Sequence, residues 1–147
     1  NIEGFFNEDI KIENPSTKIV YDAEKLVESK SDVIFRVSAL VGANRLPGRR
    51  FSGKVLEYPK TKINFVHRAD VISATKYIID NDLNGIFNLC SKEHPTKEDL
   101  YIFNAKKYNF EPPISCDNNE SLNRLIDGSK ISKQGFVYKY NSAFDLD

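Results

Sequence analysis

Apolar residues recur at helical spacing after Pro15. Five of them occupy positions i, i+1, i+4, i+7 and i+8, which places them on one side of an α-helix: Ile19, Val20, Ala23, Leu26 and Val27. Pro15, Ser16 and Thr17 supply the chemistry of a helix start, since a hydroxyl can cap the first free N–H groups. The polar residues 29–32 end the pattern. The segment therefore predicts one helix.

Short apolar runs alternate with further helical patterns along the rest of the chain. The runs Val33–Val37 and Gly85–Cys90 are typical of strands buried on both faces of a parallel sheet. Residues 70–80 show helical spacing, and Thr96 with Asp99 forms a variant capping box that starts another helix. Short strands are also expected at 62–66 and 136–140, whereas residues 1–14 read as a connecting loop. This alternation is the signature of an α/β fold.

Composition and charge narrow the class of protein. The chain has 147 residues, enough for one domain (1–147) with a real core. Lys plus Arg and Asp plus Glu both number 21, so no net charge draws the chain toward nucleic acid or a membrane. No apolar run approaches the ~18 residues of a membrane span. We expect a cytoplasmic protein, with Cys90 and Cys116 as free thiols.

The beginning of the chain carries a separate expectation. The sequence contains no methionine and begins at Asn1. Because newly made proteins begin with methionine, we expect a processed product, an engineered fragment or the tail of a longer chain.

Tyr21 and Lys25 are candidates for acid–base chemistry. They lie four residues apart on the predicted helix, which makes them neighbours on its surface. A free phenol has a pKa of about 10, and a nearby ammonium lowers that pKa toward the range in which a tyrosine can transfer protons. The same spacing also occurs by chance, with the tyrosine at the edge of the core and the lysine in solvent. Spacing alone leaves both interpretations open.

Several segments, taken in order, resemble the NAD(P)-dependent epimerase/dehydratase family, the extended short-chain dehydrogenases/reductases. The resemblance covers nearly the whole chain. The matching segments are Tyr21-x-x-x-Lys25, the strand and loop at 34–42, Asn64-Phe65-Val66-His67-Arg68-Ala69-Asp70-Val71, the strand at 85–89, and 129–136. The resemblance implies the C-terminal part of a Rossmann-like doubly wound sheet together with a small substrate-binding region.

The family resemblance also implies roles for individual residues. Tyr21 would be the general acid/base at a hydroxyl or carbonyl of a nucleotide-sugar-like or other substrate. Lys25 would lower its pKa and bind the nicotinamide ribose. Seven further residues are implied, the first three near the nicotinamide and the last four near the substrate: Ser38, Ala39, Leu40, Arg45, Arg49, Arg50 and His67.

Each of these loop and strand-end candidates has an ordinary structural alternative. The three arginines can grip a diphosphate, but they are equally common in a solvated loop. His67 can equally be a hydrogen-bonded structural residue near the site. No metal site is expected, because His67 and His94 are the only histidines and neither lies at ligand spacing from a cysteine.

Two departures from the family pattern shape the functional prediction. The usual Tyr-Gly-Pro after the strand is replaced by Val41-Gly42-Ala43, and no glycine-rich loop for a dinucleotide pyrophosphate is present. The chain alone is therefore expected to bind NAD or NADP weakly or not at all. The alternative is a non-catalytic binding or regulatory domain of atypical short-chain-dehydrogenase type. An uncovered strand at 33–37 would also favour self-association, so we expect a homo-oligomer.

Overall fold

The computed structural model describes residues 4–10, 15–42, 45–116 and 123–145. The helices are α1 (Pro15–Glu28), α2 (Arg68–Asp80), α3 (Lys97–Lys107) and α4 (Ser129–Lys133), with a single 3-10 turn at Arg49–Phe51. The strands are β1 (Gly4–Phe6), β2 (Val33–Val37), β3 (Ala39–Val41), β4 (Val55–Leu56), β5 (Phe65–His67), β6 (Gly85–Leu89), β7 (Ile114–Ser115) and β8 (Arg124–Ile126).

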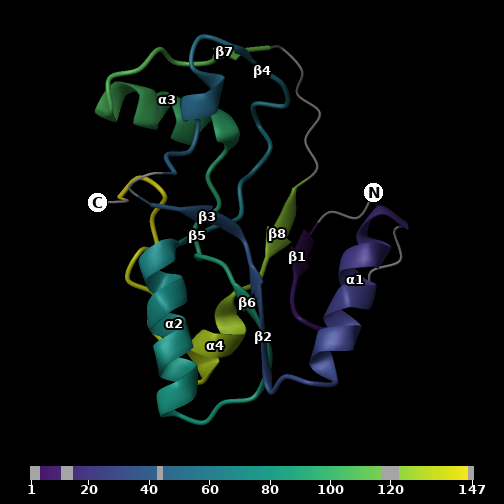
Figure 1. Cartoon of the computed structure of the whole chain (residues 1–147). Helices are drawn as coiled ribbons and strands as arrows, with labels where there is room; N and C mark the ends of the chain where they lie inside the picture. Colours follow the sequence, from purple (N-terminus) through teal and green to yellow (C-terminus); the bar gives the residue numbers. More distant parts are fainter. Residues whose placement is uncertain (1–3, 11–14, 43–44, 117–122, 146–147) are drawn as a thin grey trace.

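The strands form four parallel pairs: β1 with β8, β2 with β6, β3 with β5, and β4 with β7. The longest pair, β2–β6, lies at the centre of the molecule, with α1 on one side and α2 and α4 on the other (Figure 1). The pair β4–β7 and helix α3 lie together at the opposite end from α4 (Figure 1). A mixed α/β fold with parallel strands was predicted from the sequence and is confirmed.

One face of the β2–β6 pair builds the main core. Phe87 and Leu89 of β6 are fully covered, and Ala74 and Ile78 of α2 pack against them. Val33 and Phe35 of β2 join this cluster from the neighbouring strand, together with residues of α4 and of the C-terminal segment. Because side chains alternate along a strand, the other face carries Ile34, Arg36, Ile86 and Asn88.

Helix α1 approaches this second face with its polar side. The predicted apolar stripe has the expected period, but its residues do not cover the sheet. Ile19 is 78% exposed, Val20 69% and Leu26 72%. The helix therefore leaves its apolar side without a partner among the described residues.

Two local predictions were wrong. Residues 136–140 form no strand, because the backbone N–H groups of Lys139 and Tyr140 donate to the carboxylate of Asp70 and not to a neighbouring strand. The expected N-terminal loop contains the short strand β1, which is held by its pairing with the distant β8. A three-residue strand has no periodicity of its own, so only this tertiary contact defines it.

Candidate functional site

Tyr21 and Lys25 are neighbours on α1, as their spacing predicts. The Nζ atom of Lys25 lies 5.4 Å from the centroid of the Tyr21 ring. The same atom is 2.6 Å from Oε2 of Glu28, in an exposed ion pair. This hydrogen bond raises the pKa of Lys25 above its ordinary value. Tyr21 is half-buried, whereas Lys25 is exposed to solvent.

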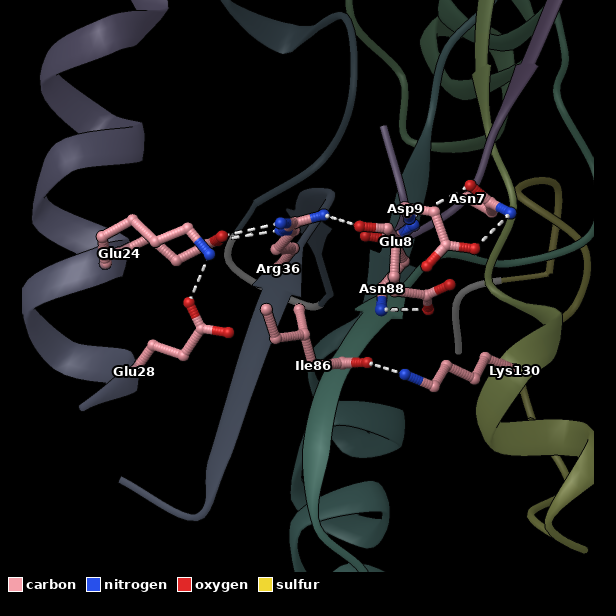
Figure 2. Close-up of polar contacts among 10 residues, drawn as sticks. Asn7, Glu8, Asp9, Glu24, Glu28, Arg36, Ile86, Asn88 and Lys130 are labelled. Carbon is pink, nitrogen blue, oxygen red and sulfur yellow. Dashed lines mark hydrogen bonds and ion pairs between the residues drawn. The ribbon is translucent and has the colours of Figure 1, made fainter. Parts of the chain in front are cut away.

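The orientation of α1 is fixed by a contact that the sequence did not reveal. Arg36 of β2 donates to both carboxylate oxygens of Glu24, from Nε at 2.8 Å and from Nη2 at 2.6 Å, and its Nη1 donates to the backbone carbonyl of Glu8 at 2.9 Å (Figure 2). Each group stabilises the charge of the other, so the pKa of Glu24 is lowered and that of Arg36 is raised, mainly by this hydrogen bonding. A lone arginine within an apolar strand is the signal that could have identified the pair.

This contact determines which residues of α1 face the sheet. At about 100° per residue, Tyr21 lies about 60° from Glu24 around the helix axis and Lys25 lies about 100° from it. Tyr21 is therefore turned toward the sheet more directly than Lys25. This geometry agrees with the half-buried tyrosine and the exposed lysine.

The segment Ser38–Leu40 lies at the carboxyl end of β2, where open parallel sheets bind ligands. The N–H of Ser38 donates to the carbonyl of Leu89 at 3.1 Å, and Ala39 then begins β3. Leu40 packs against the core, whereas Ala39 is exposed. Backbone atoms and small side chains thus dominate this strand end.

His67 has a structural role. It is buried and caps α2, since its Nδ1 accepts the backbone N–H of Ala69 at 3.2 Å. Its ring stacks on Tyr140, with 3.8 Å between the ring centroids. Burial lowers the pKa of His67, which favours the neutral ring. A side chain at Gly42 would come within 3.2 Å of its Nε2, so the strand end lies against this histidine.

The arginine loop packs against α3. Phe51 stacks on Tyr101 of that helix with 5.5 Å between ring centroids, and the guanidinium of Arg50 lies 4.8 Å from the centre of the Phe51 ring. Arg45, Arg49 and Arg50 are exposed. No ion pair joins any of the three to a carboxylate of the described chain. Their charges are available to an anionic ligand.

A hollow of about 800 Å³ lies beyond the carboxyl end of β6, and the sequence gave no sign of it. Residues of β6's carboxyl end, α4 and the C-terminal segment line it, among them Cys90, Ser91, His94, Asp127 and Tyr138. Burial raises the pKa values of the Cys90 thiol and the Tyr138 phenol, so both stay protonated at neutral pH. None of the residues predicted to bind cofactor or substrate lines this hollow.

Two further searches cover the described residues. They contain no group of three His, Cys, Asp or Glu side chains arranged to hold a metal ion. None of the helices defined by these residues has both the length and the apolar character needed to cross a bilayer.

Comparison with known proteins places this geometry in a recognised fold. No protein-family model matches the sequence. The protein YeeZ of Escherichia coli (strain K12) is 36% identical over 110 residues, which cover 73% of this chain and 40% of YeeZ. The structure of a putative NAD-dependent epimerase/dehydratase from Methylobacillus flagellatus superimposes with a TM-score of 0.75 at 18% identity, covering 96% of this chain and 55% of that one. This chain has the fold of the C-terminal half of an epimerase/dehydratase.

A second solved structure supports this conclusion. MoeE5, in complex with UDP-glucose and NAD, matches with a TM-score of 0.73 at 14% identity over 99% of this chain and 57% of its own length. The chain thus spans less than half of its curated relative YeeZ and just over half of these epimerase/dehydratase-like structures. The resemblance predicted from the sequence is confirmed at the level of the fold.

Proposed function

We propose that this chain is the C-terminal, substrate-side part of an NAD(P)-dependent epimerase, dehydratase or reductase. The observation that carries the proposal is the position of Ser38–Leu40 at the carboxyl end of a parallel strand, in a fold shared with a protein solved with UDP-glucose and NAD. Ligands of open α/β sheets bind at this edge. The substrate is a nucleotide-sugar-like molecule or another compound that carries a reacting hydroxyl or carbonyl.

Tyr21 acts as the general acid/base in this proposal. It is half-buried on the side of α1 that faces the sheet, and a tyrosine there can exchange a proton with a substrate hydroxyl. Lys25 stabilises the phenolate and binds the cofactor ribose once it releases Glu28, a change that needs only rotation of an exposed side chain. NAD or NADP supplies the hydride chemistry when bound.

The substrate contacts follow from the remaining charges. The unpaired guanidinium groups of Arg45, Arg49 and Arg50 offer forked donors that match a diphosphate. His67 contributes through its position, since its neutral ring is held by Ala69 and Tyr140 beside the end of β3.

The test uses the longest protein that the gene encodes, assayed with NAD(P) and UDP-sugars. Tyr21→Phe removes the transferable proton and is expected to lower kcat by about 10²- to 10⁴-fold. Tyr58→Phe, at an exposed tyrosine after β4, serves as the matched control and is expected to leave kcat unchanged. Full activity of Tyr21→Phe would remove Tyr21 from the mechanism.

One observation favours a second candidate function, a non-catalytic binding or regulatory domain. Lys25 is exposed and paired with Glu28, which is not the arrangement of a lysine committed to a cofactor. The two proposals differ in the effect of Lys25→Gln on the full-length protein. The enzyme requires a weaker NAD(P) affinity in this variant, whereas the binding domain predicts no change in affinity and no turnover by either protein.

A further inference from the structure

The two outer edges of the β2–β6 pair differ in their protection. The outward backbone N–H of Asn88 in β6 donates to Oε1 of Glu8 at 2.7 Å, and the outward carbonyl of Ile86 accepts from Nζ of Lys130 at 2.7 Å (Figure 2). Charged side chains thus satisfy the backbone groups that another strand would use. Proteins use such caps to prevent further pairing at a sheet edge. The β6 edge is therefore a natural end of the sheet.

The outer edge of β2 has no comparable caps. The N–H of Gly85 donates to Asp32 and the N–H of Ser38 donates to Leu89 at the two ends of the ladder, which fixes its phase. The intervening amides at positions 34 and 36 consequently face β6, while those of Val33, Phe35 and Val37 face outward. Within the described chain β2 pairs with β6 alone, and no side chain is recorded at these outward groups.

The neighbouring helix presents a second unpartnered surface. α1 contacts β2 through Glu24 and Arg36, and the apolar stripe on its opposite side is left in solvent. Ile19, Val20 and Leu26 are each more than two-thirds exposed, and Val27 is half exposed. A contiguous apolar patch of this kind marks an interaction surface. The open strand edge and the apolar stripe belong to adjacent elements (Figure 1).

The known structures indicate what covers this surface. The chain accounts for 55% and 57% of two proteins with the same fold, so the rest of the sheet must join it. The β6 edge is closed, which leaves the edge of β2. A second copy paired edge to edge through a two-fold axis would place β2 against β2 in antiparallel orientation. Every strand pair described here is parallel, so a two-fold copy is the poorer match.

We infer that the outer edge of β2 and the apolar side of α1 form the docking surface for the N-terminal part of this fold. A parallel strand of that part would complete the ladder at Val33, Phe35 and Val37, and its helix would cover Leu26 and the rest of the stripe. The inference rests on the proposed function only in taking the chain as the C-terminal part. It holds whether or not Tyr21 is catalytic.

Amide hydrogen exchange on the chain, with and without the polypeptide encoded directly upstream, tests the inference. In the chain alone, positions 34 and 36 should be protected while 33, 35 and 37 exchange quickly. The upstream polypeptide should slow these three amides by about tenfold or more, since exchange then requires opening of the new ladder. Unchanged exchange in the mixture would overturn the inference. Concentration-dependent protection in the chain alone, or the lack of an upstream coding sequence, would equally overturn it.

A pair of matched variants tests the helix surface. Leu26 on α1 is 72% exposed and Ile79 on α2 is 73% exposed, so Leu26→Lys and Ile79→Lys make the same change at equally exposed sites. Leu26→Lys should weaken binding of the upstream polypeptide by about tenfold to a hundredfold, and Ile79→Lys should not change it. Equal effects of the two variants would contradict the docking surface. Binding is measured without turnover, so loss of the proposed enzyme activity leaves this test unaffected.

Discussion

The Glu24–Arg36 pair should couple α1 to the sheet energetically as well as geometrically. Its side chains are only 13% and 22% exposed, and two charge-assisted hydrogen bonds join them. Exposed pairs contribute about 0–1 kcal/mol, whereas removal of one partner from a fully buried pair costs roughly 3–5 kcal/mol. The residual solvent contact places this pair between the two cases. We expect Glu24→Ala to lower the free energy of unfolding by about 2 kcal/mol.

A double-mutant cycle separates the interaction from the effects of the single changes. Glu24→Ala, Arg36→Ala and the double variant are compared by urea denaturation. The expected coupling free energy is about 1–2 kcal/mol. The control is the pair Lys18–Asp22 on the same helix, whose side chains are 67% and 54% exposed and whose coupling should stay below about 0.5 kcal/mol. Additive effects of the two changes at Glu24 and Arg36 would refute the reasoning.

The same pair predicts a pH dependence. Hydrogen bonding to Arg36 lowers the pKa of Glu24 below its ordinary value of 4.5. The stabilisation is therefore fully present above pH 4.5 and is lost as the pH falls through the lower pKa of the folded state. Glu24→Gln lacks this titration, so its stability should decline less between pH 5 and pH 3. An identical decline in both proteins would show that Glu24 does not contribute.

Three further changes test other contacts. Asp70 is 1% exposed and accepts two backbone N–H groups, so Asp70→Asn should cost about 2–3 kcal/mol in urea denaturation, while Asp80→Asn at an exposed position should cost little. A side chain at Gly128 would lie 2.3 Å from the backbone oxygen of Cys90, so Gly128→Ala should lower stability by roughly 1–3 kcal/mol. Burial lowers the pKa of His67, so stability should fall as the pH drops below 6.5 until the pKa of the folded state is passed; His67→Asn should show a shallower fall in a Tm series.

Regular elements were predictable where the signal is local. The apolar run Val33–Val37 forms a strand with the expected bounds, and Gly85–Leu89 differs by one residue. Thr96 and Asp99 form the expected cap at α3, with the Thr96 Oγ1 accepting the N–H of Asp99 and donating to its carboxylate. These features depend on residues a few positions apart, so the sequence pattern is sufficient.

The features that need distant partners could not be predicted. β1 exists through its pairing with β8, and the segment after α4 follows the carboxylate of Asp70 instead of a neighbouring strand. The Tyr21–Lys25 spacing gave correct neighbours on α1, but the lysine's pairing with Glu28 depends on side-chain orientation. The side of α1 that meets the sheet depends on Arg36, which follows in the next element.

The orientation of α1 links the proposed site to the proposed interface. A helix that covers a sheet normally buries its apolar side, and α1 does the reverse. At about 100° per residue, Tyr21 and Glu24 lie on one side of the helix and Leu26 lies on the opposite side. The Glu24–Arg36 contact therefore holds Tyr21 toward the sheet and turns the stripe outward at the same time. Glu24→Gln should disturb the tyrosine without changing the stripe, and Leu26→Lys should disturb docking without changing the tyrosine, so the two functions of this helix can be separated by experiment.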